Sequence, residues 1–251
     1  MKKPVIVIGM GEMGAVFARG FLRTGHPVYP VTRQASIEQV AEQVPEPELV
    51  LISVGEAALQ QVLKTIPSQW VDRLVLLQNE LLPRDWQDFP ESTVISVWFE
   101  KKKGQDSKVI LPSPAFGKKA KLLQEAMGSI DIPVRELGNA SELLFELVVK
   151  NLYILTSNIT GLKVGGTVGE LWSQHREVAM GVVEDIIALQ QALTGETFDQ
   201  QQLIDAMLAA FNGDPDHKCM GRSAPARLDR ALQLAGQFAL DVPHLREIAA
   251  T

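Results

Sequence analysis

The sequence contains a single cysteine, Cys219, among its 251 residues. One thiol forms no disulfide within the chain and no cysteine-based metal cluster, so the composition predicts a protein of the reducing cytoplasm without a metal site. No basic partner stands beside this cysteine in the sequence, and we expect an inert thiol. Positive charge is also scarce, with 24 Lys and Arg against 30 Asp and Glu. This balance predicts neither a nucleic acid nor an anionic membrane as a partner.

Long apolar runs are missing as well. The most apolar long stretch, 143–159, carries Lys150 and several polar side chains, so we expect no membrane-spanning helix. Lys2 and Lys3 precede an apolar run as in a signal peptide, but glycines interrupt that run early and no targeting segment is predicted. With 46% hydrophobic residues and a mean hydropathy of +0.05, the chain is expected to fold into one large or two ordinary globular domains.

The N-terminal segment 4–15 predicts a strand that runs into a glycine-rich turn and a helix. Its β-branched run at 5–8 lacks polar alternation, as in a strand buried on both faces of a parallel sheet. Gly9 would permit the tight turn, Gly11 would let the backbone approach a pyrophosphate, and Gly14 would let the helix pack against the strand. The alternative is a purely structural turn. The strand and helix context favours a dinucleotide site, contributed by Gly9, Met10, Gly11, Glu12, Met13 and Gly14.

The end of the second predicted strand, 28–31, bears on which dinucleotide binds. NAD-binding proteins usually place Asp or Glu there for the ribose hydroxyls, whereas this chain has Thr32 and Arg33. These side chains suit a 2'-phosphate, which favours NADP(H), although Arg33 also fits an ordinary surface position. Three more cofactor-binding candidates lie at the carboxyl ends of later predicted strands, where ligands bind: Ser53, Val54 and Asn79.

Strand and helix patterns alternate through the first half of the chain. The expected strands after the first two are 49–54, 73–78, 93–99, 108–111 and 132–136. Pro112 and Pro114 are expected to end the strand before them, and a helix is expected over 116–127. This alternation predicts an α/β fold with a doubly wound parallel sheet, a Rossmann domain over residues 1–138.

Strand patterns disappear after about Gly138, and residues 139–251 predict an all-helical domain for substrate binding and dimerisation. Its expected helices are 141–159, 168–193, 199–211, 223–239 and 243–249. Ser141 is expected to cap the first of them, and Gly161 is expected to end it. The many apolar helical faces make a homodimer an expectation as well.

The helix 141–159 is apolar nearly all round and must be largely buried. Its few polar residues fall mainly on one line at helical spacing: Glu142, Glu146, Lys150, Ser157 and Asn158. Two interpretations stay open. Glu146 and Lys150 form an ion pair along the helix, or Lys150 faces a cleft between the domains and acts on a substrate there.

These features resemble the ketopantoate reductase family, NADPH-dependent enzymes that have a Rossmann domain and a helical domain and reduce a 2-oxo acid to a 2-hydroxy acid. The likeness covers the order of elements along most of the chain and is specific in three places. The first is the glycine turn at 9–14 with Arg33. The second is Gln78-Asn79, where the family has a Gln-Asn-Gly turn. The third is Lys150 with Asn158 eight residues on and Gly169-Glu170-Leu171 beyond.

The resemblance implies a function for each of these residues. Lys150 would be the general acid at the carbonyl oxygen of a small 2-oxo acid, or of a related carbonyl compound or imine, as hydride leaves NADPH. Asn158 and Asn79 would orient substrate and cofactor through neutral hydrogen bonds.

The chain also departs from the family pattern. Ile154 stands where the family commonly has another asparagine, Glu80 replaces the glycine of the Gln-Asn-Gly turn, and the segment 214–225 lacks the family's active-site glutamate. Within that segment Arg222 and Ser223 are substrate-binding candidates that could hold a carboxylate or phosphate, or form an N-cap with a surface arginine.

These departures leave other functions open. His217 beside Asp216 fits either a proton relay or an exposed loop histidine. The alternative to a reductase is a non-catalytic NADP-binding sensor or assembly protein. The β-hydroxyacid dehydrogenase family is a third possibility, because its opening Gly-x-Gly-x-Met-Gly matches residues 9–14, although Ile154 argues against it.

Overall fold

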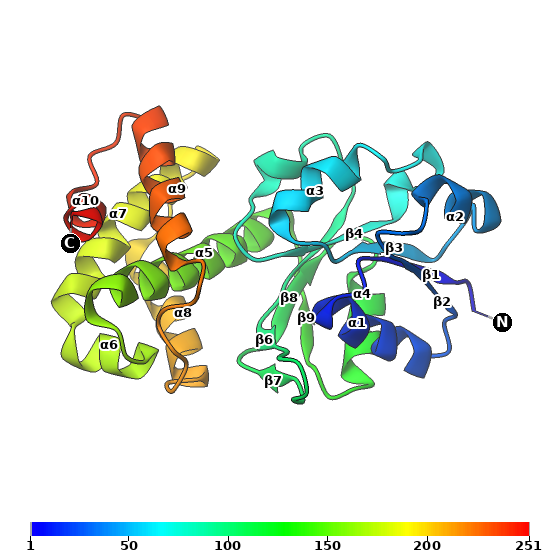
Figure 1. Cartoon of the computed structure of the whole chain (residues 1–251), viewed down its shortest axis with the longest axis horizontal. Coiled ribbons are helices and arrows are strands. Elements are labelled where there is room, and N and C mark those ends of the chain that lie inside the picture. The colour runs from blue at the N-terminus through cyan, green and yellow to red at the C-terminus, as the bar shows by residue number, and fades with distance from the viewer. Residues whose placement is uncertain (1, 251) are drawn as a thin grey trace. The chain divides into compact units, whose positions relative to one another are not determined.

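The structure, a computed structural model, describes residues 2–250 and divides the chain into two compact units, Met1–Glu146 and Leu147–Thr251. The first unit holds the sheet and the second is helical, which confirms the predicted fold class (Figure 1). Helix α5 (Ala140–Val164) begins in the first unit and continues into the second. The boundary at 138/139 stays a prediction.

Seven strands of the first unit form one sheet in the order β2-β1-β3-β4-β5-β8-β9. The first five run parallel, β8 is antiparallel to β5, and β9 is parallel to β8. Because β2 and β3 lie on opposite sides of β1, the chain reverses direction across the sheet there, and ligands bind at such a point. The strands are β1 (Val5–Ile8), β2 (Val28–Val31), β3 (Leu49–Ile52), β4 (Leu74–Gln78), β5 (Thr93–Ser96), β8 (Ser113–Phe116) and β9 (Val134–Glu136).

Helices cover both faces of this sheet (Figure 1). On one face Phe17 and Phe21 of α1 and Leu123 of α4 are fully buried against alternate strand residues such as Val7. On the other face the fully buried Trp70 donates from Nε1 to the carbonyl oxygen of Val44 at 3.0 Å. The helices are α1 (Glu12–Arg23), α2 (Ile37–Gln43), α3 (Glu56–Leu63), α4 (Ala120–Gly128) and the 3-10 turns η1 (Ser68–Arg73) and η2 (Pro83–Trp86).

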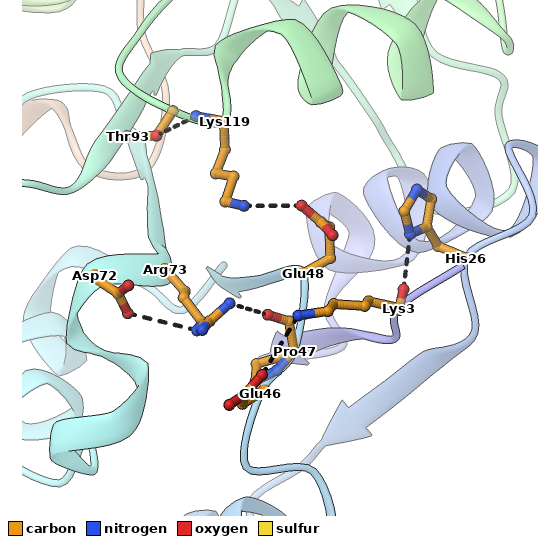
Figure 2. Close-up of polar contacts among 9 residues, drawn as sticks. All are labelled: Lys3, His26, Glu46, Pro47, Glu48, Asp72, Arg73, Thr93 and Lys119. Carbon is orange, nitrogen blue, oxygen red and sulfur yellow. Dashed lines mark hydrogen bonds and ion pairs between the residues drawn. The ribbon is translucent and has the colours of Figure 1, made fainter. Parts of the chain in front are cut away.

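Polar side chains tie together the amino ends of the strands (Figure 2). Arg73 donates from Nη1 to the carbonyl oxygen of Pro47 at 2.9 Å, which joins the segments before β4 and β3. Lys119 donates from Nζ to Glu48 Oε1 at 2.8 Å and from its backbone nitrogen to Thr93 Oγ1 at 2.9 Å. These contacts fasten the amino ends of the strands, whereas ligands of such sheets bind at the carboxyl ends.

The contact between Lys119 and Glu48 predicts that the free energy of unfolding decreases in acid. The Lys119 hydrogen bond holds the pKa of Glu48 below its usual value. The stabilisation from this contact is therefore complete above the pKa that Glu48 has in the unfolded chain. It is lost as pH falls through the lower pKa that Glu48 has in the folded protein. We expect Lys119→Met to lower the free energy of unfolding by about 1 kcal/mol at pH 7, and by less in acid, in urea titrations at both pH values.

Lys118→Met is the matched control for this prediction. Lys118 pairs with Glu91, and both side chains are 63% exposed, so solvent screens that pair and we expect little change in stability. An equal loss at neutral and acidic pH in Lys119→Met would contradict the assignment.

Three predictions near the end of the sheet are wrong. The expected strand 93–99 stops at Ser96, and its last residue joins a separate hairpin of β6 (Phe99–Glu100) and β7 (Lys108–Val109). Pro114 ends no strand but lies within β8, and α4 begins at Ala120 instead of 116. Proline is tolerated because β8 pairs with β5 only through Ala115 and Phe116, so Pro114 lies outside that ladder.

The second unit packs five further helices with the C-terminal part of α5 (Figure 1). The expected helix 168–193 is broken at His175, although no proline or glycine marks the break. Among residues 2–250, none of the helices is both long and apolar enough to cross a bilayer. The five are α6 (Val168–Gln174), α7 (Arg176–Thr194), α8 (Gln200–Gly213), α9 (Ala224–Gln237) and α10 (Pro243–Ala249).

Both predicted ends of the first long helix are wrong. Asn139, not Ser141, caps α5, since its Oδ1 accepts from the backbone nitrogen of Glu142 at 2.9 Å. Gly161 lies inside the helix. A Cβ at this position would stand 2.8 Å from the Cβ of Cys219, so glycine provides room for the segment that crosses α5 there. The helix ends before Gly165, which has a φ of +66°.

Candidate functional site

Two glycines of the predicted dinucleotide turn are required by the fold itself. Gly9 has a φ of +93°, a conformation that favours glycine. Gly14 packs so closely against the turn that a Cβ would lie 2.0 Å from the carbonyl oxygen of Gly9 and 2.6 Å from Ser53 Oγ. These positions therefore fix the shape of the turn.

Gly11 differs from both. It has an ordinary extended backbone, with φ −75° and ψ −168°, and a Cβ there would meet no protein atom within 4 Å. No side chain caps α1 at this position, so the first amides of the helix have no side-chain acceptor at the N-cap. The space beside Gly11 and the uncapped helix end fit the pyrophosphate of a dinucleotide.

The neighbours of this turn lie at the same edge of the sheet. Met10 is 38% exposed, which is unusual for a large apolar side chain, and Glu12 is also exposed, while Met13 packs partly on the core. Ser53 donates from its hydroxyl to the carbonyl oxygen of Gly9. If Gly9 carried a Cβ, that atom would lie 3.0 Å from the Val54 side chain. Ser53 and Val54 thus support the turn, and a direct contact with a cofactor stays a prediction for both.

Thr32 and Arg33 are exposed directly after β2. The backbone nitrogen of Gly9 donates to the carbonyl oxygen of Val31 at 2.9 Å, so the end of β2 lies beside the glycine turn. Within residues 2–250 the Arg33 guanidinium has no hydrogen-bond or ion-pair partner. Its charge is available to an anionic ligand at this edge.

A lysine at the turn was not singled out from the sequence. Lys101 Nζ, in the loop between β6 and β7, lies 3.9 Å from Glu12 Oε2. Because a carboxylate in the first turn of α1 would repel phosphate, this cation reduces the repulsion at the site. The only sequence signal for it was the run of three lysines at 101–103, which fits a solvated loop equally well.

Asn79 is exposed at the carboxyl end of β4, whereas the neighbouring Gln78 is buried. The backbone nitrogen of Glu80 donates to Glu56 Oε1 at 2.9 Å, which joins this turn to the start of α3. Glu80 is not among the described residues with positive φ, so its turn does not need the family's glycine.

In the second unit, Lys150 is buried on α5 with only 6% of its surface exposed. Its Nζ lies 5.6 Å from the centre of the Tyr153 ring, which stabilises a cation there. Tyr153 is not among the residues predicted for the site, although its spacing of three residues from the lysine places both on one helix face. Glu146 accepts a hydrogen bond from Arg135 in the first unit, and its predicted pairing with Lys150 stays a prediction.

Asn158 lies two turns further along α5, half-buried. Arg227 of α9 donates from Nη1 to Asn158 Oδ1 at 2.9 Å, and Asn158 donates from Nδ2 to Ser157 Oγ at 3.4 Å. Lys150 and Asn158 are thus on one helix of one unit, as predicted, and Arg227 joins them as an additional charged residue.

The segment before α9 is anchored by the predicted Gly-Glu-Leu sequence. The backbone nitrogen of Gly169 donates to the carbonyl oxygen of Pro215 at 3.0 Å, and Glu170 completes a capping box with Thr167. Arg222 and Ser223 are exposed beyond this anchor, and the Ser223 side chain makes no cap. They are accessible to a ligand, and their binding role stays a prediction.

His217 and Cys219 lie in the same segment. His217 Nδ1 lies 3.8 Å from Asp214 Oδ2, and the ring centre of His217 is 6.4 Å from that of Tyr153. The acidic residue beside His217 in the structure is thus Asp214, where the sequence pointed to Asp216. Cys219 is fully buried, and burial raises the pKa of its thiol to about 11. A thiol protonated at neutral pH is unreactive, as expected.

No family model matches this chain, and no curated protein does. Solved structures do resemble it. A dimeric ketopantoate reductase from Staphylococcus aureus has 19% identity and a TM-score of 0.68, covering 98% of this chain and 96% of its own. A 2-dehydropantoate 2-reductase from Methylococcus capsulatus has 16% identity and a TM-score of 0.66, covering 98% and 94%. A D-mandelate dehydrogenase in complex with NADH has 14% identity and a TM-score of 0.65, covering 99% and 96%. The chain therefore has the fold of the ketopantoate reductases over nearly its whole length.

Proposed function

We propose that this protein is an NADPH-dependent oxidoreductase that reduces a small 2-oxo acid, or a related carbonyl compound or imine. The observation that carries the proposal is Lys150, a cation buried on the long helix of a fold whose solved neighbours are named as reductases and dehydrogenases of 2-oxo and 2-hydroxy acids. Oxidation of NADPH that depends on added 2-oxo acid tests it.

The chain's own residues would bind and protonate the substrate. A bound nicotinamide supplies the hydride for the carbonyl carbon. Lys150 donates a proton to the carbonyl oxygen, where negative charge develops. Asn158 binds the substrate and Asn79 orients the reactants at the end of β4. The space beside Gly11 receives the pyrophosphate.

Arg33 should select the cofactor. We propose that its unpaired guanidinium binds the 2'-phosphate of NADPH, because a charge-assisted hydrogen bond to an exposed phosphate contributes about 1.5–3 kcal/mol. Wild-type protein should therefore bind NADPH at least about tenfold more tightly than NADH, and Arg33→Gln should remove the difference. Quenching of tryptophan fluorescence measures both affinities.

Arg23→Gln serves as the control for Arg33, since Arg23 is an exposed arginine at the end of α1. It should keep the preference for NADPH. Binding of NADH in preference to NADPH by the wild type would contradict the role given to Arg33.

A non-catalytic NADP-binding sensor or assembly protein is the second candidate. The observation that favours it is the segment 214–225, which carries no glutamate for the substrate and exposes Arg222 and Ser223. Turnover that is lost in a Lys150 variant would exclude it. In either case we propose a cytoplasmic homodimer, as one structural neighbour is a dimer, and light scattering of the purified protein tests the dimer.

A further inference from the structure

The contact between Arg227 and Asn158 determines which way the Asn158 amide faces. Arginine carries five N–H donors and no acceptor. The 2.9 Å contact from its Nη1 must therefore end on the amide oxygen, Oδ1. The amide nitrogen then faces away from the guanidinium, and the donor chemistry of arginine fixes the orientation of the Asn158 side chain.

The amide nitrogen of Asn158 has one N–H to offer a ligand. Of its two N–H groups, one faces Ser157 Oγ at 3.4 Å. That hydroxyl in turn donates to the carbonyl oxygen of Tyr153 at 2.7 Å, so it is held in place as an acceptor. The second N–H of Asn158 has no acceptor within residues 2–250, and the side chain is only half-buried. The group that Asn158 binds must be an acceptor.

The charge of the segment that passes this amide favours one kind of acceptor. The segment from His217 to Arg227 contains Lys218, Arg222 and Arg227 and no Asp or Glu. Part of it crosses α5 at Gly161, where a Cβ would lie 2.8 Å from the Cβ of Cys219. A Cβ at Gly221 would lie 3.9 Å from Asn158 Oδ1, so the segment also passes beside Asn158. An N–H donor fixed by a guanidinium beside a segment without acids favours a carboxylate over a neutral carbonyl or hydroxyl group.

We propose that Asn158 binds the carboxylate of the substrate through Nδ2 and that Arg227 is the positioning residue that holds this amide and supplies the positive charge. The inference rests on the proposed reduction of a 2-oxo acid and deepens it. It makes the acid group itself, and not only the carbonyl, a requirement for binding. It also identifies a cation directly after the segment 214–225, in which this chain lacks the family's glutamate.

Oxamate and oxamide provide a test that needs no turnover. Oxamate mimics a 2-oxo acid and carries a carboxylate, and oxamide is its neutral counterpart of nearly equal size. In calorimetric titrations with NADPH present, the wild type should bind oxamate about ten- to a hundredfold more tightly than oxamide, the range for a hydrogen bond to a charged group. Arg227→Gln keeps an N–H donor but removes the charge, and the preference should disappear.

Conservative and control variants separate this role from a structural one. Arg227→Lys keeps the charge and should retain most of the preference for oxamate. Asn158→Asp should form an ion pair with Arg227 and keep the melting temperature, but it removes the N–H donor and should abolish oxamate binding. Arg246→Gln, on the exposed surface of α10, should bind like the wild type.

The outcomes distinguish this inference from the proposed function. Equal preference for oxamate in the wild type and in Arg227→Gln, or no binding of oxamate by the wild type, would overturn the role of Arg227. A preference that is lost in Arg227→Gln would support it even if no 2-oxo acid were reduced. In that case the reductase proposal would fail and the carboxylate site would stand.

Discussion

Replacement of Lys150 by methionine is expected to lower turnover about a thousandfold, the middle of the range for loss of a general acid. Methionine has a similar length and no charge, so it should fill the buried position on α5 without a loss of stability. Because the proposed contacts to the phosphates of NADPH come from the glycine turn and Arg33 and not from Lys150, the affinity for NADPH should change little. Steady-state kinetics and fluorescence titration measure the two effects separately.

Lys163→Met is the matched control on the same helix. Lys163 pairs with Glu247 of α10 and its side chain is 30% exposed, so its loss should leave turnover near the wild-type value. Turnover of Lys150→Met within about tenfold of the wild type would show that the proton comes from another donor.

Gly11→Ser is expected to abolish cofactor binding in a protein that folds normally. The backbone at Gly11 is extended, a Cβ there meets no protein atom within 4 Å, and serine is a good N-cap residue. Stability should therefore be unchanged or slightly higher. The new side chain would fill the space meant for the pyrophosphate, and the loss of backbone contacts to it should raise the Kd for NADPH at least about a hundredfold.

Two other glycines provide the comparison for Gly11. Gly128→Ser, in an open position at the end of α4, should change neither stability nor binding. Gly14→Ala should prevent normal folding, since the new Cβ would overlap the carbonyl oxygen of Gly9. Normal NADPH affinity in Gly11→Ser would mean that the turn is purely structural.

The strands and the glycine turn could be predicted because their signals are local. The run at 5–8 and the spacing of Gly9, Gly11 and Gly14 depend on a few neighbouring residues, and the structure forms the expected strand and helix there. The sequence could not show that Gly9 and Gly14 serve the fold while Gly11 leaves room for a ligand. That difference depends in part on Ser53, directly after β3, which packs against both Gly9 and Gly14.

The errors and omissions depend on contacts between distant segments. Gly161 was expected to end α5 by its propensity, but the crossing segment around Cys219 requires a small residue inside the helix. Pro114 was expected to end a strand, yet its place in β8 depends on where the pairing with β5 stops. Arg227 contacts a residue 69 positions away, and only the packing of α9 beside α5 reveals it. The spacing of three residues from Lys150 along one helix was enough to identify Tyr153 from the sequence, but no such local spacing identifies Arg227.

The central claim is that the chain reduces 2-oxo acids with NADPH and a proton from Lys150. The most direct measurement follows the absorbance of reduced nicotinamide while a panel of small 2-oxo acids and imines is added to wild-type protein and to Lys150→Met. We predict that at least one 2-oxo acid is reduced by the wild type at the expense of NADPH and that the variant loses this activity. NADPH that binds but is never oxidised by any member of the panel, or oxidation that persists unchanged in Lys150→Met, would contradict the claim.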